Sequence, residues 1–226
     1  MTEAKAFLFD LNGTMVNDMP YHIKAWQKIL NDLGAHLSYE RVKIECYGKN
    51  SELLERIFPG RFSDKEKNEM ELEKEKAYQK TYQPELKLID GLDTFLKETH
   101  AAGIKMAIGS AAIMFNIDFV VDGLNIRKYF DAIVSAESVK MSKPHPETYL
   151  LAADLLQLAP TDCLVFEDTP MGVKSALNAG MKAVVITSLH QQDEFSEYPN
   201  VIKFAKDFTG LQEIINVKIL CHQVSP

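Results

Sequence analysis

Acidic side chains stand at the ends of two apolar runs of this sequence. Asp10 follows the run Ala6–Phe9, and Glu167 and Asp168 follow the run Cys163–Phe166. Carboxylates are ligands that Mg²⁺ prefers, and an aspartate can also accept a phosphoryl group as an aspartyl-phosphate. If the two runs are neighbouring strands, these carboxylates could form a metal site with a nucleophile beside it.

Two further positions offer hydrogen-bond donors for a phosphate. Ser110 follows the apolar run Lys105–Ile108, and Lys143 lies in the loop 141–146 before a predicted helix. Each residue alone has an ordinary explanation, since Asp and Ser often form turns or cap helices and a loop lysine is usually solvated. Together, a nucleophile, a metal site and phosphate donors indicate phosphoryl transfer.

The elements that must position these residues are predicted from short, continuous apolar runs, which are typical of strands buried in a parallel sheet. The predicted strands are Ala6–Phe9, Lys105–Ile108, Ala132–Val134, Cys163–Phe166 and Ala183–Ile186. Amphipathic helices are predicted between most of them, at Gly91–Ala102, Pro146–Gln157 (with Pro146 as its first residue) and Pro170–Ala179. Alternating strands and helices predict an α/β fold with a Rossmann-like, doubly wound parallel sheet, whose carboxyl edge carries the ligand site.

Residues 15–86 interrupt this alternation with helical patterns. The predicted helices are Tyr21–Leu33, Ser38–Glu45, Ser51–Phe58 and Asp64–Tyr82. About seventy residues are long for a simple connection, so we expect a helical cap domain inserted into a core domain of residues 1–14 and 87–226. The hinges are expected near 15–20 and 83–88.

Composition limits the classes of partner and compartment. The chain has 226 residues and a formal net charge of −7, which argues against nucleic acid as a partner. No signal peptide or membrane span is predicted, and the scattered Cys46, Cys163 and Cys221 are expected to be reduced thiols. We therefore expect a cytoplasmic protein, a monomer or weak dimer, with a small phosphorylated substrate.

Four motifs, at residues 9–14, 108–110, 142–146 and 166–173, carry a resemblance to the haloacid dehalogenase superfamily. Within it, the chain resembles the β-phosphoglucomutases and small-metabolite phosphatases that have a helical cap. The resemblance implies Asp10 as nucleophile, Lys143 as catalytic residue, and Mg²⁺ as cofactor. The implied metal ligands are Asp10, Asn12 (through its backbone carbonyl), Glu167 and Asp168. The implied substrate-binding residues are Thr14, His22, Trp26, Lys49, Ser51, Lys74, Ser110 and Ala111.

Asn12 departs from the family pattern, which has aspartate as general acid and base at this position. An amide cannot transfer a proton, so turnover is expected to fall unless another group substitutes, and Asn12 is itself expected to be part of the catalytic centre. Ser51 and the run 112–114 also replace residues that grip a distal phosphate in the mutases. We therefore expect a phosphatase, with a β-phosphoglucomutase and a non-catalytic phospholigand-binding protein as alternatives.

Overall fold

The computed structural model describes residues 4–214, so the predicted thiol Cys221 and the tail from Val217 lie outside the described residues. The chain folds as two compact units. The core unit comprises the described residues up to Asn17 and from Lys87 onward, and the helical unit comprises Asp18–Leu86. The role of the helical unit as a cap stays a prediction.

The core unit is built on a parallel sheet with strand order β3-β2-β1-β4-β5-β6. The strands are β1 (Ala6–Phe9), β2 (Lys105–Gly109), β3 (Ala132–Val134), β4 (Cys163–Glu167), β5 (Lys182–Ile186) and β6 (Val201–Ala205). The predicted Rossmann-like doubly wound sheet is confirmed, and all five predicted strands are present. The sixth was not predicted because it is a half-exposed edge strand whose apolar run is interrupted by Lys203.

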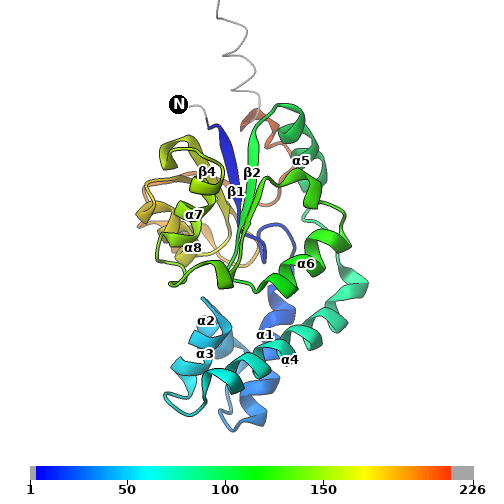
Figure 1. The fold of residues 1–226 in the computed structure, drawn as a ribbon, viewed down its shortest axis with the longest axis vertical. Helices are drawn as coiled ribbons and strands as arrows, with labels where there is room; N and C mark the ends of the chain where they lie inside the picture. Colours follow the sequence, from blue (N-terminus) through cyan, green and yellow to red (C-terminus); the bar gives the residue numbers. More distant parts are fainter. Residues whose placement is uncertain (1–3, 215–226) are drawn as a thin grey trace, which may run out of the picture. The chain divides into compact units, whose positions relative to one another are not determined.

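Helices cover both faces of this sheet (Figure 1). They are α5 (Leu92–Ala101), α6 (Met114–Gly123), α7 (Glu147–Leu155) and α8 (Pro170–Asn178). Ala6 and Leu8 of β1 pack into the core beneath α7 and α8, whereas Phe7 and Phe9 point to the other face and contact Phe95 of α5. Burial on both faces explains why β1 is apolar throughout rather than alternating.

Two helix assignments in the core unit differ from the sequence prediction. Helix α7 begins at Glu147, and Pro146 is its N-cap, whose carbonyl accepts the first helical hydrogen bond from Leu150 N–H (3.0 Å). Helix α6 was not predicted, because its sequence is apolar on most of its circumference and shows little amphipathic contrast. Short 3₁₀ turns complete the chain at Gln83–Glu85, Arg127–Tyr129, Ala136–Ser138, Pro160–Asp162 and Gln192–Phe195.

The helical unit contains α1 (Met19–Asp32), α2 (Tyr39–Glu45), α3 (Asn50–Ile57) and α4 (Asp64–Tyr82). It has its own apolar core, formed by Ile23, Trp26, Leu30, Val42, Leu53 and Leu54. Helix α1 begins two residues earlier than predicted because Pro20 lies in its first turn, where a missing N–H costs nothing. Among the described residues, no helix combines the length and apolarity needed to cross a bilayer.

Candidate active site

The sheet brings the strand-end residues together at its topological switch point. Strand β1 pairs with β4 on one side, with Phe9 opposite Phe166, and with β2 on the other, with Phe9 opposite Ile108. Asp10, directly after β1, and Glu167, the last residue of β4, therefore emerge side by side. The strand order reverses between β1 and β4, which is where ligands bind in open α/β sheets.

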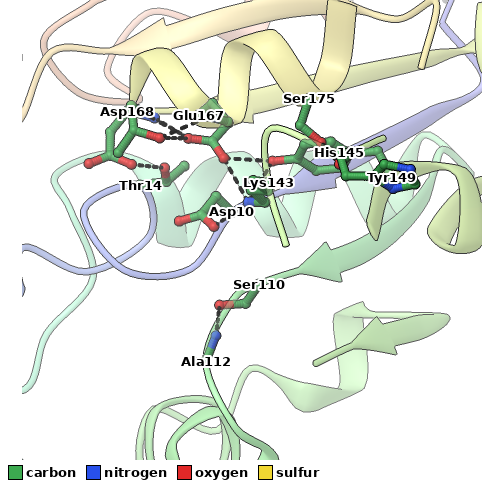
Figure 2. Close-up of polar contacts among 12 residues, drawn as sticks. Asp10, Thr14, Ser110, Ala112, Lys143, His145, Tyr149, Glu167, Asp168 and Ser175 are labelled. Carbon is green, nitrogen blue, oxygen red and sulfur yellow. Dashed lines mark hydrogen bonds and ion pairs between the residues drawn. The ribbon is translucent and has the colours of Figure 1, made fainter. Parts of the chain in front are cut away.

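Lys143 is the cation at the centre of this site (Figure 2). Its Nζ donates to Asp10 Oδ1 at 2.6 Å and to Glu167 Oε1 at 2.7 Å. All three side chains are buried, with 8% or less of each residue exposed. Burial alone would lower the pKa of Lys143, but the charges of Asp10 and Glu167 raise it well above its ordinary value. The lysine therefore carries its charge at every physiological pH.

The loop that carries Lys143 is held by helix α8. The Ser175 hydroxyl donates to the His145 carbonyl at 2.8 Å, and the Asn178 amide donates to the Pro144 carbonyl at 2.9 Å. These two side-chain donors satisfy backbone carbonyls of the loop and so fix its conformation. Helix α8 starts at Pro170, just after Glu167 and Asp168, so the helix that holds the loop of the lysine also lies next to the acidic pair.

Glu167 accepts hydrogen bonds on both carboxylate oxygens. Its Oε1 accepts from Lys143 and from the Tyr149 hydroxyl (2.8 Å), and its Oε2 accepts from Asp168 N–H (3.0 Å) and Thr169 N–H (3.1 Å). Burial opposes the charged form, but Lys143 and these donors lower the pKa of Glu167 below its ordinary value. Glu167 is therefore ionised and rigidly held.

Asp168 lies in the opposite electrostatic situation. It is fully buried, its Oδ1 accepts from the Thr14 hydroxyl at 3.1 Å, and its Oδ2 has no hydrogen-bond partner among the described residues. Burial, followed by the charges of Glu167 and Asp10, raises the pKa of Asp168 well above its ordinary value. A buried carboxylate oxygen without a partner is costly, and a bound cation would remove that cost.

Two glycines leave room for these carboxylates. A Cβ added at Gly13, whose φ is +84°, would lie 2.1 Å from Asp168 Oδ2, and one added at Gly172 would lie 1.7 Å from Glu167 Oε1. Any side chain at either position would displace an acid. The backbone therefore approaches the acidic pair more closely than another residue type would allow.

The residues present fit a divalent metal ion. Asp10, Glu167 and Asp168 each offer an oxygen atom, and these atoms lie within 4.8 Å of one another. Three carboxylates face one lysine, so two negative charges remain uncompensated when all are ionised. An oxygen-only donor set with excess negative charge suits a hard cation rather than a soft one.

Other predicted residues of the core unit take different places. Ser110 is buried at the end of β2, and its Oγ accepts from Ala112 N–H at 3.1 Å. Ala111 and Asn12 are half-buried, and Asn12 lies in the tight turn that is closed by Met15 N–H donating to Leu11 O at 2.8 Å. The Thr14 hydroxyl is engaged with Asp168, and its direct role in substrate binding stays a prediction.

The predicted residues of the helical unit take part in a separate polar network or lie near it. Lys74 Nζ lies 2.6 Å from His22 Nδ1 and 5.7 Å from the centre of the Trp26 ring. Lys49 is the N-cap of α3, and Ser51 lies in the first turn of that helix. Their roles in substrate binding stay predictions.

One residue of the site was missed by sequence reasoning. Tyr149 contacts both Lys143 and Glu167, and its hydroxyl is fully buried between them. In the sequence it follows Pro146 by three residues inside an apolar helical stretch, which is the pattern of an ordinary core aromatic. Its position one helical turn beyond the lysine loop was the available signal.

Comparison with known proteins identifies relatives for most of the chain, including both units. Residues 7–186 match the family model described as haloacid dehalogenase-like hydrolase. The fructose-1-phosphate phosphatase of Escherichia coli is 30% identical, over 80% of this chain and 96% of its own length. The hexitol phosphatase A of the same organism is 31% identical, over 91% of this chain and 93% of its own length.

A solved structure shares both folds. The β-phosphoglucomutase of Clostridium difficile superimposes with a TM-score of 0.81 and is 26% identical, covering 96% of this chain and 99% of that protein. Similarity therefore extends through the helical unit as well as the core unit. It confirms the resemblance that the four sequence motifs indicate.

Proposed function

The chain belongs to the haloacid dehalogenase-like hydrolase family, among its sugar phosphatases and phosphomutases, and from this we propose that it is a Mg²⁺-dependent phosphatase. Its substrate would be a small phosphorylated metabolite, foremost a sugar phosphate. The observation that carries the proposal is the buried contact between Asp10 and Lys143 beside the acidic pair of β4. The fructose-1-phosphate and hexitol phosphatases among its relatives support the substrate class.

In the first step, a carboxylate oxygen of Asp10 attacks phosphorus, and the bond from phosphorus to the leaving oxygen breaks. The product is an aspartyl-phosphate on Asp10. Lys143, 2.6 Å from Asp10 Oδ1, would offset negative charge on the transferring group, and the hydroxyl of Ser110 would donate to one of its oxygens. Water then attacks phosphorus, the bond to Asp10 breaks, and phosphate leaves.

Asp10, Glu167, Asp168 and the backbone carbonyl of Asn12 would hold the metal. The buried Asp168 Oδ2, which has no hydrogen-bond partner among the described residues, would be available to it. When bound, Mg²⁺ supplies positive charge to the phosphoryl oxygens. The residues themselves fix the nucleophile and shield it from bulk water.

Asn12 limits the rate in this proposal. The leaving oxygen needs a proton in the first step, and the attacking water must lose one in the second. An asparagine amide can do neither. General acid–base catalysis is worth roughly 10²–10⁴-fold, so turnover should be low by about that factor. Substrates with a good leaving group, such as acyl phosphates, should be affected least in the first step.

The test compares the wild type with Asn12→Asp on a panel of phosphorylated metabolites. Phosphate release should depend on Mg²⁺ and should rise by roughly 10²–10⁴-fold in the variant. Asn125→Asp, a change at another core-unit asparagine, is the matched control and should leave the rate unchanged. If neither protein releases phosphate at any Mg²⁺ concentration, the phosphatase proposal is wrong.

A β-phosphoglucomutase is the second candidate, supported by the likeness of both units to that enzyme. Residues 111–115 read Ala-Ala-Ile-Met-Phe and carry no charge to hold a second phosphate. We therefore rank the phosphatase first. Interconversion of β-glucose 1- and 6-phosphates, primed by a bisphosphate, would favour the mutase instead. Phosphate release without isomerisation would support the phosphatase.

A non-catalytic phospholigand-binding protein is the third candidate, and Asn12 is the observation that favours it. Binding needs the cation, the lysine and the hydroxyl, but no proton transfer. Retained affinity for phosphate, with no turnover gained by Asn12→Asp, would select this candidate over the two enzymes.

A further inference from the structure

We propose that Tyr149 is a positioning residue for phosphoryl transfer, because its hydroxyl holds Lys143 and Glu167 in the arrangement that directs the lysine at Asp10. This inference rests on the proposed function. The Tyr149 hydroxyl lies 2.9 Å from Lys143 Nζ and 2.8 Å from Glu167 Oε1, and the residue is fully buried. Figure 2 shows it on the side of the lysine that is opposite Asp10.

The direction of both hydrogen bonds is fixed by chemistry. An ammonium group can only donate, and an ionised carboxylate can only accept. The Tyr149 oxygen therefore accepts from Lys143, and its one hydrogen is donated to Glu167. The phenol must be neutral to do both. A hydroxyl that accepts on one side and donates on the other couples the lysine to the acid in one orientation.

The hydroxyl also completes the hydrogen bonding of a buried ammonium. Lys143 has three N–H groups, and the structure gives them three acceptors, in Asp10 Oδ1, Glu167 Oε1 and the Tyr149 oxygen. Two of the three acceptors, Glu167 Oε1 and the Tyr149 oxygen, belong to residues other than the nucleophile and fix the position of the ammonium group. With these two hydrogen bonds made, the third N–H is directed at Asp10.

The ring of Tyr149 is fixed independently of its hydroxyl. Its centre lies 4.7 Å from Lys143 Nζ, and a Cβ added at Gly109 would lie 3.2 Å from its Cε1. The ring therefore packs against the end of β2, directly before Ser110. Removing the hydroxyl alone should leave this packing in place, so the two roles of the residue can be separated.

The ordinary alternative is that Tyr149 is a core aromatic whose hydroxyl merely finds partners. It belongs to the apolar core between the sheet and α7 and α8, so its ring contributes to stability in either case. The alternative predicts that Tyr149→Phe changes stability at most and leaves the chemical step alone. The positioning role predicts that Tyr149→Phe slows the chemical step and leaves stability nearly unchanged.

The experiment measures kcat, KM and Tm for Tyr149→Phe in the Asn12→Asp background with Mg²⁺ and the best phosphorylated substrate of the panel. We expect kcat to fall roughly tenfold, below the about 10²-fold that a 1 Å misplacement can cost, with KM changed less than about twofold. The Tm should stay close to that of the parent because the ring remains. Tyr198→Phe, in a tyrosine packed against the same core, should leave kcat unchanged.

The outcomes separate this inference from the proposed function. If kcat is equal in the Asn12→Asp parent and its Tyr149→Phe derivative, the positioning role is wrong while the phosphatase stands. A lowered Tm with unchanged kcat would assign Tyr149 to the core alone. If the parent itself is inactive with every phosphorylated substrate, the proposed function fails and this inference fails with it.

Discussion

The two units each bury a cluster of charged side chains, and the clusters differ in how their charge is balanced. The core cluster consists of Asp10, Lys143, Glu167 and Asp168, and the helical cluster consists of Asp18, His22, Lys74 and Glu75. All eight residues are 8% exposed or less. Burying a charge is costly unless it is paired and hydrogen-bonded, so each cluster must find its compensation somewhere.

The helical cluster is compensated to a larger extent by the protein itself. Glu75 accepts from Lys74 at 2.8 Å and from the amide of Asn50 at 3.0 Å. Asp18 accepts from the Tyr78 hydroxyl at 2.5 Å and lies 3.4 Å from His22 Nε2. The two carboxylates of the helical cluster, Asp18 and Glu75, thus face a lysine, a histidine and neutral donors.

The core cluster is left incomplete by the protein. Three carboxylates face one lysine, whereas the helical cluster has two carboxylates beside a lysine and a histidine. A buried oxygen without a hydrogen-bond partner does not separate the clusters, since Asp168 Oδ2 and Glu75 Oε2 both lack one among the described residues. The comparison teaches that burial and charge alone do not mark a ligand site, since both units have them. What distinguishes the core cluster is its excess of carboxylates over cations, which a bound cation would offset.

The largest expected effect is that of Asp10→Asn on activity. Removing a covalent nucleophile should lower kcat by on the order of 10⁴-fold or more in the Asn12→Asp background. Asp93→Asn, an exposed aspartate of α5, is the control and should leave kcat unchanged. Steady-state phosphate release measures both, and equal activity of the two variants would remove Asp10 from the mechanism.

The next largest effect is the loss of stability when either buried lysine is replaced. Lys143→Met and Lys74→Met each leave buried carboxylates without their cation and should cost about 3–5 kcal/mol of unfolding free energy. Urea unfolding with and without Mg²⁺ should separate them, because the metal can replace charge only in the core cluster. Equal recovery of both variants by Mg²⁺ would contradict the difference between the clusters.

A third effect is stabilisation of the wild type by the metal. At about 100 times its dissociation constant, Mg²⁺ should add roughly 2.7 kcal/mol of stability. Asp168→Asn should abolish this gain, and Glu75→Gln in the helical cluster should retain it. Thermal unfolding at several Mg²⁺ concentrations measures the gain. A gain that survives Asp168→Asn would place the metal elsewhere.

The smallest effect is a pH dependence of the helical cluster. Burial opposes ionisation of Glu75, but the charges of Lys74 and His22 and its hydrogen bonds lower its pKa below the ordinary value of 4.5. The stability that Glu75 contributes is therefore present above pH 4.5 and is lost as pH falls through its folded-state pKa. A difference of one pH unit between the folded-state and unfolded-state pKa corresponds to about 1.4 kcal/mol. Stability curves of wild type and Glu75→Gln should converge in acid. A constant difference from pH 6 to pH 3 would contradict this assignment.

The sequence predicted the position of the core cluster better than its contacts. Asp10 and the acidic pair were located because continuous apolar runs mark parallel strands, and the ends of such strands meet at one edge. Tyr149 was missed because its contacts depend on how α7 packs beside the loop of Lys143. His22 and Lys74 lie 52 residues apart, and their contact likewise follows from the packing of α1 on α4. Edge strand β6 lacked the apolar signal of the buried strands.

The most direct measurement is intact-protein mass spectrometry after incubation with acetyl phosphate and Mg²⁺, followed by peptide mapping. An acyl phosphate needs little help from a general acid, so the wild type with Asn12 should still be phosphorylated. The account predicts a phosphoryl adduct on Asp10 that requires Mg²⁺ and is absent from Asp10→Asn. Absence of an adduct from the wild type, or an adduct that persists in Asp10→Asn, would contradict it.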